Sequence, residues 1–100
     1  MVRINWTLGA VEDLRNIKNY ISKDSGQYAK IQVKRIKSRT EILKHQPFIG
    51  RSVPEVASEK IRELLEGNYR IIYKIVHDEQ IDILTIHHSA RNLQSNKLNV

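Results

Sequence analysis

At 100 residues, the chain has the size of one domain and is too short to divide into two separate cores. Its composition, with 40% hydrophobic and 28% charged residues, is that of a globular protein rather than a disordered one. Cysteine is absent, which excludes a disulfide framework and thiolate metal sites and favours a reducing compartment such as the cytoplasm. Because the sequence has no apolar run of membrane-spanning length and no apolar segment typical of a secretory signal near its start, we expect neither membrane insertion nor secretion.

The net charge of +6 is unevenly distributed along the chain. Residues 1–50 contain ten Lys and Arg against four Asp and Glu, whereas residues 51–100 contain seven of each. Most of the excess lies between Lys30 and Lys44, and a basic surface there would attract nucleic acid, a ribosome or an acidic protein segment. A solvated helix face, kept basic for solubility, would explain the same charge.

The first elements are a short strand and a helix. Residues 2–6 alternate apolar and polar side chains, which predicts a strand with one apolar face. Thr7 is a suitable N-cap, and beyond it the apolar residues recur at steps of three and four until about Ser22. This pattern predicts an amphipathic helix.

A second amphipathic helix follows a turn at residues 23–26 and stops before Pro47. Its exposed side carries Lys30, Lys34 and Lys37 at steps of three or four residues. The charge excess is therefore assigned to one element, and these three lysines are candidate binding residues.

The remainder of the chain has a β pattern. Residues 46–59 follow no period and are expected to form a connecting loop. Strands are predicted over residues 60–66, 69–77 and 81–88, separated by polar turns, which makes an antiparallel meander. The polar tail 94–100 is expected to be flexible or ordered only by a partner.

This order of elements predicts a single α+β domain over residues 1–100. An N-terminal strand and a helical hairpin precede the three-stranded meander, and the helices pack on one face of a four-stranded sheet. The other face would remain available as a concave surface for a ligand.

Standard catalytic motifs are absent from the sequence, including phosphate-binding loops, nucleophile elbows and Cys/His metal spacings, so we expect no metal and no cofactor. His87 and His88 are consecutive and would point to opposite faces of a strand, so they cannot readily share one metal. One of them could act as a base or phosphate ligand, while the other would be a packed or capping residue.

Two arginines are candidate phosphate ligands, because a guanidinium group offers a fork of donors and stays charged. Arg70 lies in the middle of a strand, where either a ligand surface or a salt bridge to Glu63 or Asp82 would explain its charge. Arg91 follows the last strand, where a surface arginine is ordinary.

Over nearly its whole length, the chain resembles the ParE/RelE toxin superfamily in the order and spacing of several segments. These are Trp6-Thr7, Ala10, Asp13-Leu14, Ile17, Tyr20-Ile21, Pro47-Phe48-Ile49-Gly50-Arg51-Ser52-Val53-Pro54-Glu55, Arg62-Glu63-Leu64, Gly67-Asn68-Tyr69-Arg70-Ile71-Ile72-Tyr73-Lys74-Ile75 and His88-Ser89-Ala90-Arg91. The fold of that superfamily is similar to the one predicted above.

The resemblance implies the toxin of a bacterial type II toxin-antitoxin module, associated with plasmid stabilisation and growth arrest and held inactive by a cotranscribed antitoxin. ParE-like members poison DNA gyrase and are not enzymes, whereas RelE-like members cut mRNA on the ribosome without a metal. In either case Lys30, Lys34, Lys37 and Arg62 are expected to bind the target or the antitoxin. A non-toxic module that binds nucleic acid is a further alternative, supported by charge alone.

If the chain is RelE-like, the resemblance implies catalytic roles for Arg70, Arg91 and the histidines His87 and His88. The basic pair that RelE-like enzymes carry on the second strand is replaced by Ile61 and Glu63, and no tyrosine follows Tyr73. These departures, together with the long helical hairpin, favour a ParE-like gyrase poison over a ribonuclease.

Overall fold

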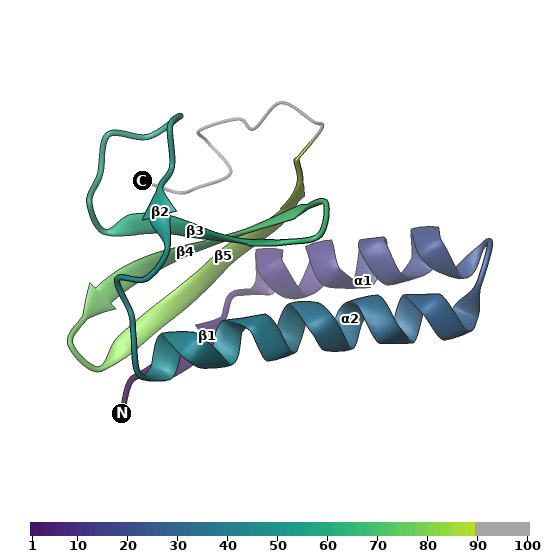
Figure 1. Ribbon diagram of the computed structural model, residues 1–100, viewed down its shortest axis with the longest axis horizontal. Helices are drawn as coiled ribbons and strands as arrows, with labels where there is room; N and C mark the ends of the chain where they lie inside the picture. The colour runs from purple at the N-terminus through teal and green to yellow at the C-terminus, as the bar shows by residue number, and fades with distance from the viewer. Residues whose placement is uncertain (90–100) are drawn as a thin grey trace.

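The computed structural model describes residues 1–89 and consists of a helical hairpin packed against a twisted sheet (Figure 1). Its elements in chain order are β1 (Arg3–Trp6), α1 (Leu8–Ser22), α2 (Gly26–Thr40), the 3₁₀ helix η1 (Glu41–Lys44), β2 (Arg51–Ser52), β3 (Ile61–Glu66), β4 (Tyr69–His77) and β5 (Gln80–His88). No helix among these residues is long and apolar enough to cross a membrane.

Side-chain caps start both helices of the hairpin. The Thr7 hydroxyl oxygen accepts a hydrogen bond from the amide of Ala10 at 3.2 Å, as its expected role as N-cap of α1 requires. Ser25 caps α2 in the same way, accepting from the amide of Tyr28 at 3.1 Å. The second helix ends at Thr40, and η1 completes the turn towards Pro47.

The sheet contains five strands in the order β1-β5-β4-β3-β2. Strands β3, β4 and β5 form the predicted antiparallel meander, and β1 pairs in parallel with β5, with Ile4 opposite Ile81. The two helices supply the crossover between β1 and the rest of the sheet, as expected for strands that run in parallel. The two-residue strand β2 lies within the predicted connecting loop and pairs with β3; it is too short to show a period.

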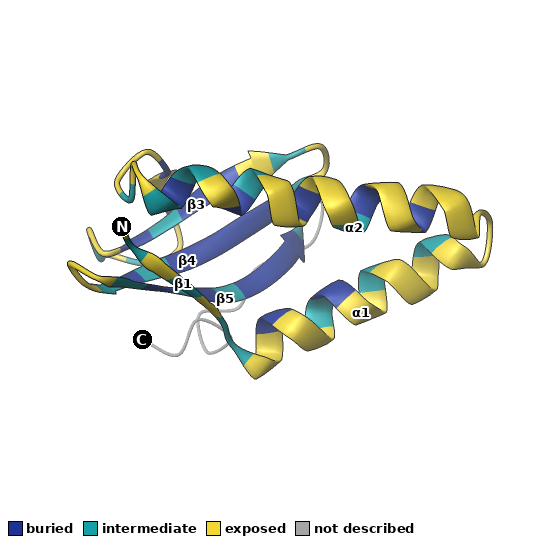
Figure 2. Ribbon diagram, turned by 90° about the horizontal axis from the view of Figure 1, so that it is seen from below, coloured by how far each residue is buried: buried dark blue, intermediate teal, exposed yellow. Residues whose placement is uncertain are grey.

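The main core lies between the hairpin and the sheet, where the dark blue stripes of both helices in Figure 2 turn towards the strands. Ala10 of α1 and Ile36 of α2 are fully buried there against residues of β4 and β5 such as Ile71, Tyr73 and Ile83. Trp6 and Ile17 pack around this cluster at partial exposure. The apolar faces that the sequence predicted for these elements are therefore the faces that are buried.

We expected the opposite face of the sheet to be open, but part of it is covered by a loop. Val53, from the loop after β2, is buried together with Ile61 of β3 and Ile72 of β4, and Val56 packs against them. The apolar side chains of Ile61 and Ile72 need a cover, and this loop provides it.

Helix α1 also covers part of the free edge of β5. Strand β1 ends at Trp6, opposite Ile83, and β5 continues beyond it. There the Asp13 carboxylate accepts hydrogen bonds from the amide of Ile86, at 3.2 Å, and from the Thr85 hydroxyl. A side chain thus takes the place of a neighbouring strand and removes an unpaired donor from the edge.

The buried Gln32 of α2 provides a test of how an unsatisfied buried polar group affects stability. Its Nε2 atom is buried and has no hydrogen-bond partner in the described part of the chain, while its Oε1 accepts only a long bond of 3.4 Å from Tyr28. An unsatisfied buried donor costs about 1–3 kcal/mol, so Gln32→Leu should raise the free energy of unfolding by about 1 kcal/mol in urea titrations. The same exchange at the exposed Gln27 is the matched control and should change it by less than about 0.5 kcal/mol. A Gln32→Leu variant less stable than wild type would contradict this account.

Candidate functional site

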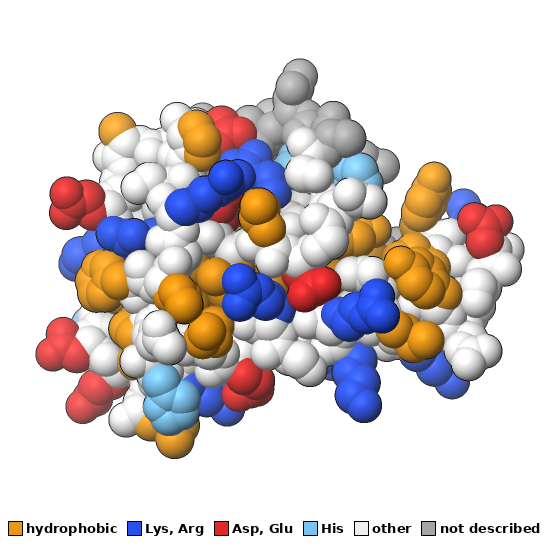
Figure 3. Space-filling model, in the orientation of Figure 1, with side chains coloured by type: hydrophobic (Ala, Val, Ile, Leu, Met, Phe, Trp, Pro, Cys, Tyr) orange, Lys and Arg blue, Asp and Glu red, His pale blue; other side chains and the backbone are white. Residues whose placement is uncertain are grey.

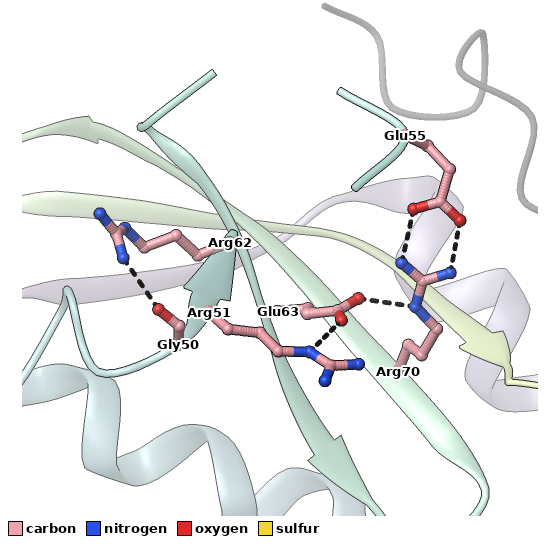
Figure 4. Close-up of polar contacts among 6 residues, drawn as sticks. All are labelled: Gly50, Arg51, Glu55, Arg62, Glu63 and Arg70. Carbon is pink, nitrogen blue, oxygen red and sulfur yellow. Dashed lines mark hydrogen bonds and ion pairs between the residues drawn. The ribbon is translucent and has the colours of Figure 1, made fainter. Parts of the chain in front are cut away.

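A network of arginines and carboxylates lies on the sheet face opposite the hairpin (Figure 4). At its centre is Glu63 of β3, whose side chain is fully buried. Its Oε2 accepts from Arg51 Nε and its Oε1 from Arg70 Nε, both at 2.6 Å. The strand register makes these contacts, because Arg51 lies directly opposite Glu63 and Arg70 lies on β4, two residues from Ile72, which pairs with Glu63.

Glu55, from the loop after β2, binds the two terminal nitrogens of the Arg70 guanidinium group. Its two carboxylate oxygens accept from Nη1 and Nη2, each at 2.8 Å. These hydrogen bonds from Arg70 lower the pKa of Glu55 from its usual 4.5 to about 2, against a smaller opposing effect of burial. Glu55 and Glu63 in turn raise the pKa of Arg70, so both members of the pair are charged at neutral pH. All three guanidinium nitrogens of Arg70 are therefore engaged by carboxylates.

Of the two explanations for the mid-strand charge of Arg70, the structure contains the salt bridge to Glu63. Asp82, the other partner considered, instead accepts from Asn5 and Gln80. The second carboxylate, Glu55, lies in a loop without periodicity, so nothing in the sequence indicated its distance from Arg70.

Arg62 binds the backbone just before β2 and at the end of the loop that follows it, rather than joining the Glu63 network. Its Nε donates to the carbonyl of Glu59 at 3.0 Å, and its Nη1 donates to the carbonyl of Gly50 at 2.9 Å. The guanidinium also lies over the ring of Phe48, 5.0 Å from the centroid, in a cation–π contact. The Phe48 ring remains mostly exposed, at 59%. Arg62 and Phe48 thus present a mixed apolar and cationic surface.

The Tyr73 side chain holds the backbone just before β2 in place. Its hydroxyl accepts from the amide of Gly50 at 3.0 Å and donates to the carbonyl of Pro47 at 2.8 Å. A side chain at position 50 would not fit, since a Cβ there would come within 2.5 Å of the Tyr73 hydroxyl. Burial raises the pKa of Tyr73, which keeps this phenol neutral.

The two histidines separate as their consecutive positions predicted. His87 is buried and lies opposite Arg70 in the register of β4 and β5, on the face of the ion-pair network. His88 lies opposite Tyr69 and meets its ring edge-on, with centroids 5.4 Å apart. Only His87 is thus brought near Arg70, and Arg91 lies outside the described residues.

The three lysines of α2 lie elsewhere, on the helical hairpin. Lys30, Lys34 and Lys37 are exposed and, with Lys18 of α1, line a groove of about 330 Å³ between the helices. The hairpin covers one face of the sheet and the arginine network occupies the other, so the structure does not unite these two sets of candidate residues. Within residues 1–89, no group of three or more His, Cys, Asp or Glu side chains could hold a metal ion.

Comparison with known proteins identifies the class of protein to which this fold belongs. Residues 4–93 match the family described as ParE toxin of type II toxin-antitoxin system, parDE. Toxin RelE2 of Caulobacter vibrioides is 32% identical over 91 residues, which cover 91% of this chain and 99% of the relative. Putative toxin Y4kP of Sinorhizobium fredii is 36% identical over 87 residues, covering 87% and 88%. The class is that of type II toxins.

The solved structure of the chromosomal ParDE TA system from P. aeruginosa is similar, with a TM-score of 0.73 and 25% identity over 88% of this chain and 96% of the matched chain. The chain belongs to the ParE toxin family and is the toxin component of a type II toxin-antitoxin system. Membership implies a cognate antitoxin as its protein partner.

The ion pair between Arg70 and Glu55 gives a prediction for stability against pH. Because the pKa of Glu55 is lower in the folded state, its contribution is complete above the ordinary value near 4.5 and is lost as the pH falls towards about 2. Glu55→Gln should therefore unfold more easily at pH 7, by about 1 kcal/mol for this partly exposed carboxylate. In urea titrations the difference from wild type should shrink steadily below pH 4.

The matched control is Glu59→Gln in the same loop, since the described contacts of Glu59 use its backbone carbonyl. It should follow the wild-type curve at every pH. A Glu55→Gln variant that matched wild type at pH 7 would show that the bidentate contact contributes nothing to the loop.

Proposed function

We propose that this toxin is a ParE-like poison of DNA gyrase that acts in the bacterial cytoplasm and does not itself cleave RNA. In this proposal the toxin binds gyrase and stalls its reaction on DNA, and the cognate antitoxin prevents this. The observation that carries the proposal is the occupied state of Arg70, the arginine that a RelE-like ribonuclease would need for its phosphate.

An RNA phosphate approaching Arg70 would meet two carboxylates first. Glu55 accepts from both terminal nitrogens and Glu63 accepts from Nε, so three of the five guanidinium N–H donors are used, and two carboxylates already balance the charge that a phosphate would need. An enzyme that cleaves RNA without a metal must stabilise a highly charged transition state, and it does so with cationic side chains in its site. Here β3 offers an apolar residue, Ile61, and a buried acid, Glu63, at the positions where RelE-like enzymes carry cations.

Few side chains near Arg70 could transfer a proton. Arginine does not deprotonate in proteins, and the Tyr73 hydroxyl is engaged by Gly50 and Pro47. His87 remains as a proton carrier beside Arg70, since His88 lies on the other side of the strand. RNA cleavage moves protons at two oxygen atoms, so it usually needs both a general base and a general acid, and one imidazole would have to serve as both.

The alternative function is that of a RelE-like, ribosome-dependent mRNA endoribonuclease. It is favoured by the position of His87 directly opposite Arg70, and by the name of the relative Toxin RelE2. This function would require Glu55 to leave Arg70 when RNA binds, so that Arg70 and His87, with Arg91, could form the catalytic group.

The antitoxin is proposed to contact the surface formed by Arg62 and Phe48. Phe48 and its neighbour Ile49 are exposed by 59% and 44%, and Arg62 adds a positive charge beside them. Aromatic and arginine side chains are the residue types that contribute most to protein interfaces. An antitoxin segment with apolar and acidic residues would complement this surface.

The gyrase and ribosome functions can be separated with purified components. Toxin added to gyrase and supercoiled plasmid should raise the yield of linear DNA after detergent and protease treatment at least about tenfold over a toxin-free reaction, a change of about 1.4 kcal/mol in the cleavage equilibrium. On programmed ribosomes, primer extension should show no new mRNA ends, because Arg70 is occupied. His87→Ala is the control and should leave gyrase poisoning unchanged.

Rapid codon cleavage by the wild-type toxin, lost in His87→Ala, would overturn the gyrase proposal in favour of the ribonuclease. The same conclusion would follow if Glu55→Gln accelerated mRNA cleavage, because this would identify Glu55 as an obstacle in a true catalytic site.

Expression in cells tests toxicity and the antitoxin surface together. The toxin alone should arrest growth, and coexpression of its antitoxin should restore it. Phe48→Ala should remain toxic but need several-fold more antitoxin for rescue, since an exposed aromatic anchor of an interface typically contributes about 1–2 kcal/mol. Leu8→Ala, at a residue of the hairpin that is 75% exposed, is the matched control and should be rescued like wild type. Normal growth with abundant soluble toxin would count against toxicity itself.

A further inference from the structure

The groove between the two helices concentrates positive charge, and within residues 1–89 none of its lysines forms an ion pair with a carboxylate. Its lining consists of Lys18 from α1 and of Lys30, Val33, Lys34, Lys37 and Ser38 from α2. The sequence of α2, GQYAKIQVKRIKSRT, holds five cationic residues and no acidic one. In the space-filling view, blue side chains follow the hairpin while most red ones gather elsewhere (Figure 3).

This arrangement is unfavourable for the isolated toxin. Lys30 and Lys34 are four residues apart on one helix, where like charges repel, and Lys18 adds another positive charge from across the groove. No carboxylate is among the residues that line the groove. In η1, directly after the hairpin, Lys44 has a counter-ion in Glu41 at 2.6 Å, whereas the lysines of the groove have no such neighbour in its lining. The groove is thus suited to an external anion.

The composition of the groove favours a phosphate backbone over an acidic protein segment. Val33 is the one apolar residue in its lining and packs partly into the core, whereas four of the six lining residues are lysines. Lysine ammonium groups are mobile point charges that suit phosphates without reading sequence. The row from Lys30 to Lys37 is about 10 Å long, at 1.5 Å per residue, which is long enough to meet more than one phosphate of a DNA strand.

We propose that this groove binds the phosphate backbone of duplex DNA, so that the toxin contacts the DNA held by gyrase as well as the enzyme. The biological setting rests on the proposed function, but the DNA contact can be measured with the toxin alone. In this assignment Lys18, Lys30, Lys34 and Lys37 bind the target, and the antitoxin-binding surface lies at Arg62 and Phe48.

The experiment measures binding of the full-length toxin to a fluorescent 20-base-pair duplex by anisotropy at several salt concentrations. Each phosphate contact contributes about −0.9 to the slope of log affinity against log salt, so four lysines predict a slope of about −3 to −4. The variant Lys30→Gln/Lys34→Gln/Lys37→Gln should bind at least about tenfold more weakly at low salt, with the slope reduced by two or more. Circular dichroism and the thermal midpoint establish that it remains folded.

The control Lys23→Gln/Lys60→Gln/Lys74→Gln removes the same charge from positions outside the groove and should weaken DNA binding less than about threefold. Equal losses in the two triple variants would mean that net charge alone attracts DNA, and would overturn the proposal. So would absence of binding by the wild-type toxin at low salt. A groove variant that kept its DNA affinity but lost affinity for the antitoxin would assign the groove to an acidic protein segment instead.

The gyrase assay distinguishes this proposal from the one on which it rests. Poisoning by wild-type toxin that persists in the groove variant would contradict the DNA contact and leave gyrase as the target. Groove-dependent DNA binding without any effect on gyrase would contradict the target and leave the DNA site.

Discussion

The buried carboxylate of Glu63 is the constraint on which the face of the sheet opposite the hairpin depends. A charge removed from water must be paired, and Glu63 is paired twice, by Arg51 from β2 and by Arg70 from β4. Arg70 is thereby held in the orientation that receives Glu55 from the loop. The short strand β2, the course of the loop and the occupied state of Arg70 all follow from this one buried acid.

The segment of residues 47–60, which contains β2, is held by three different kinds of contact. Tyr73 fixes its beginning at Pro47 and Gly50, Arg62 binds backbone carbonyls, and Glu55 closes the bidentate pair with Arg70. Beneath it the loop covers a small apolar cluster that would otherwise be exposed to water. A segment without regular secondary structure thus becomes a defined surface, because its polar groups and its apolar groups are both satisfied.

The two sides of the molecule differ in whether their cationic side chains are paired with carboxylates. On the face of the loop, Arg51 and Arg70 are paired with carboxylates within the molecule, and this matters for function because a phosphate would have to compete with those carboxylates for the guanidinium charge. On the hairpin, the lysines of the groove are left without carboxylates. The net positive charge of the toxin is therefore available mainly from the helices, which leads us to place contact with a nucleic acid there rather than at Arg70.

The sequence by itself determined the elements, their order and their buried sides, because apolar periods and capping residues such as Thr7 are local signals. It also identified the basic stretch of α2 and the family. It named Glu63 as one possible partner of Arg70 but did not indicate the second partner, since Glu55 lies in a loop whose path has no period, and it did not predict the two-residue strand β2. Nor did it separate the candidate residues: Arg70 and His87 meet across two strands while Lys30 lies on the other side of the sheet. These were decisions of the tertiary structure, because strand register and the folding of the loop bring together residues that no local pattern connects.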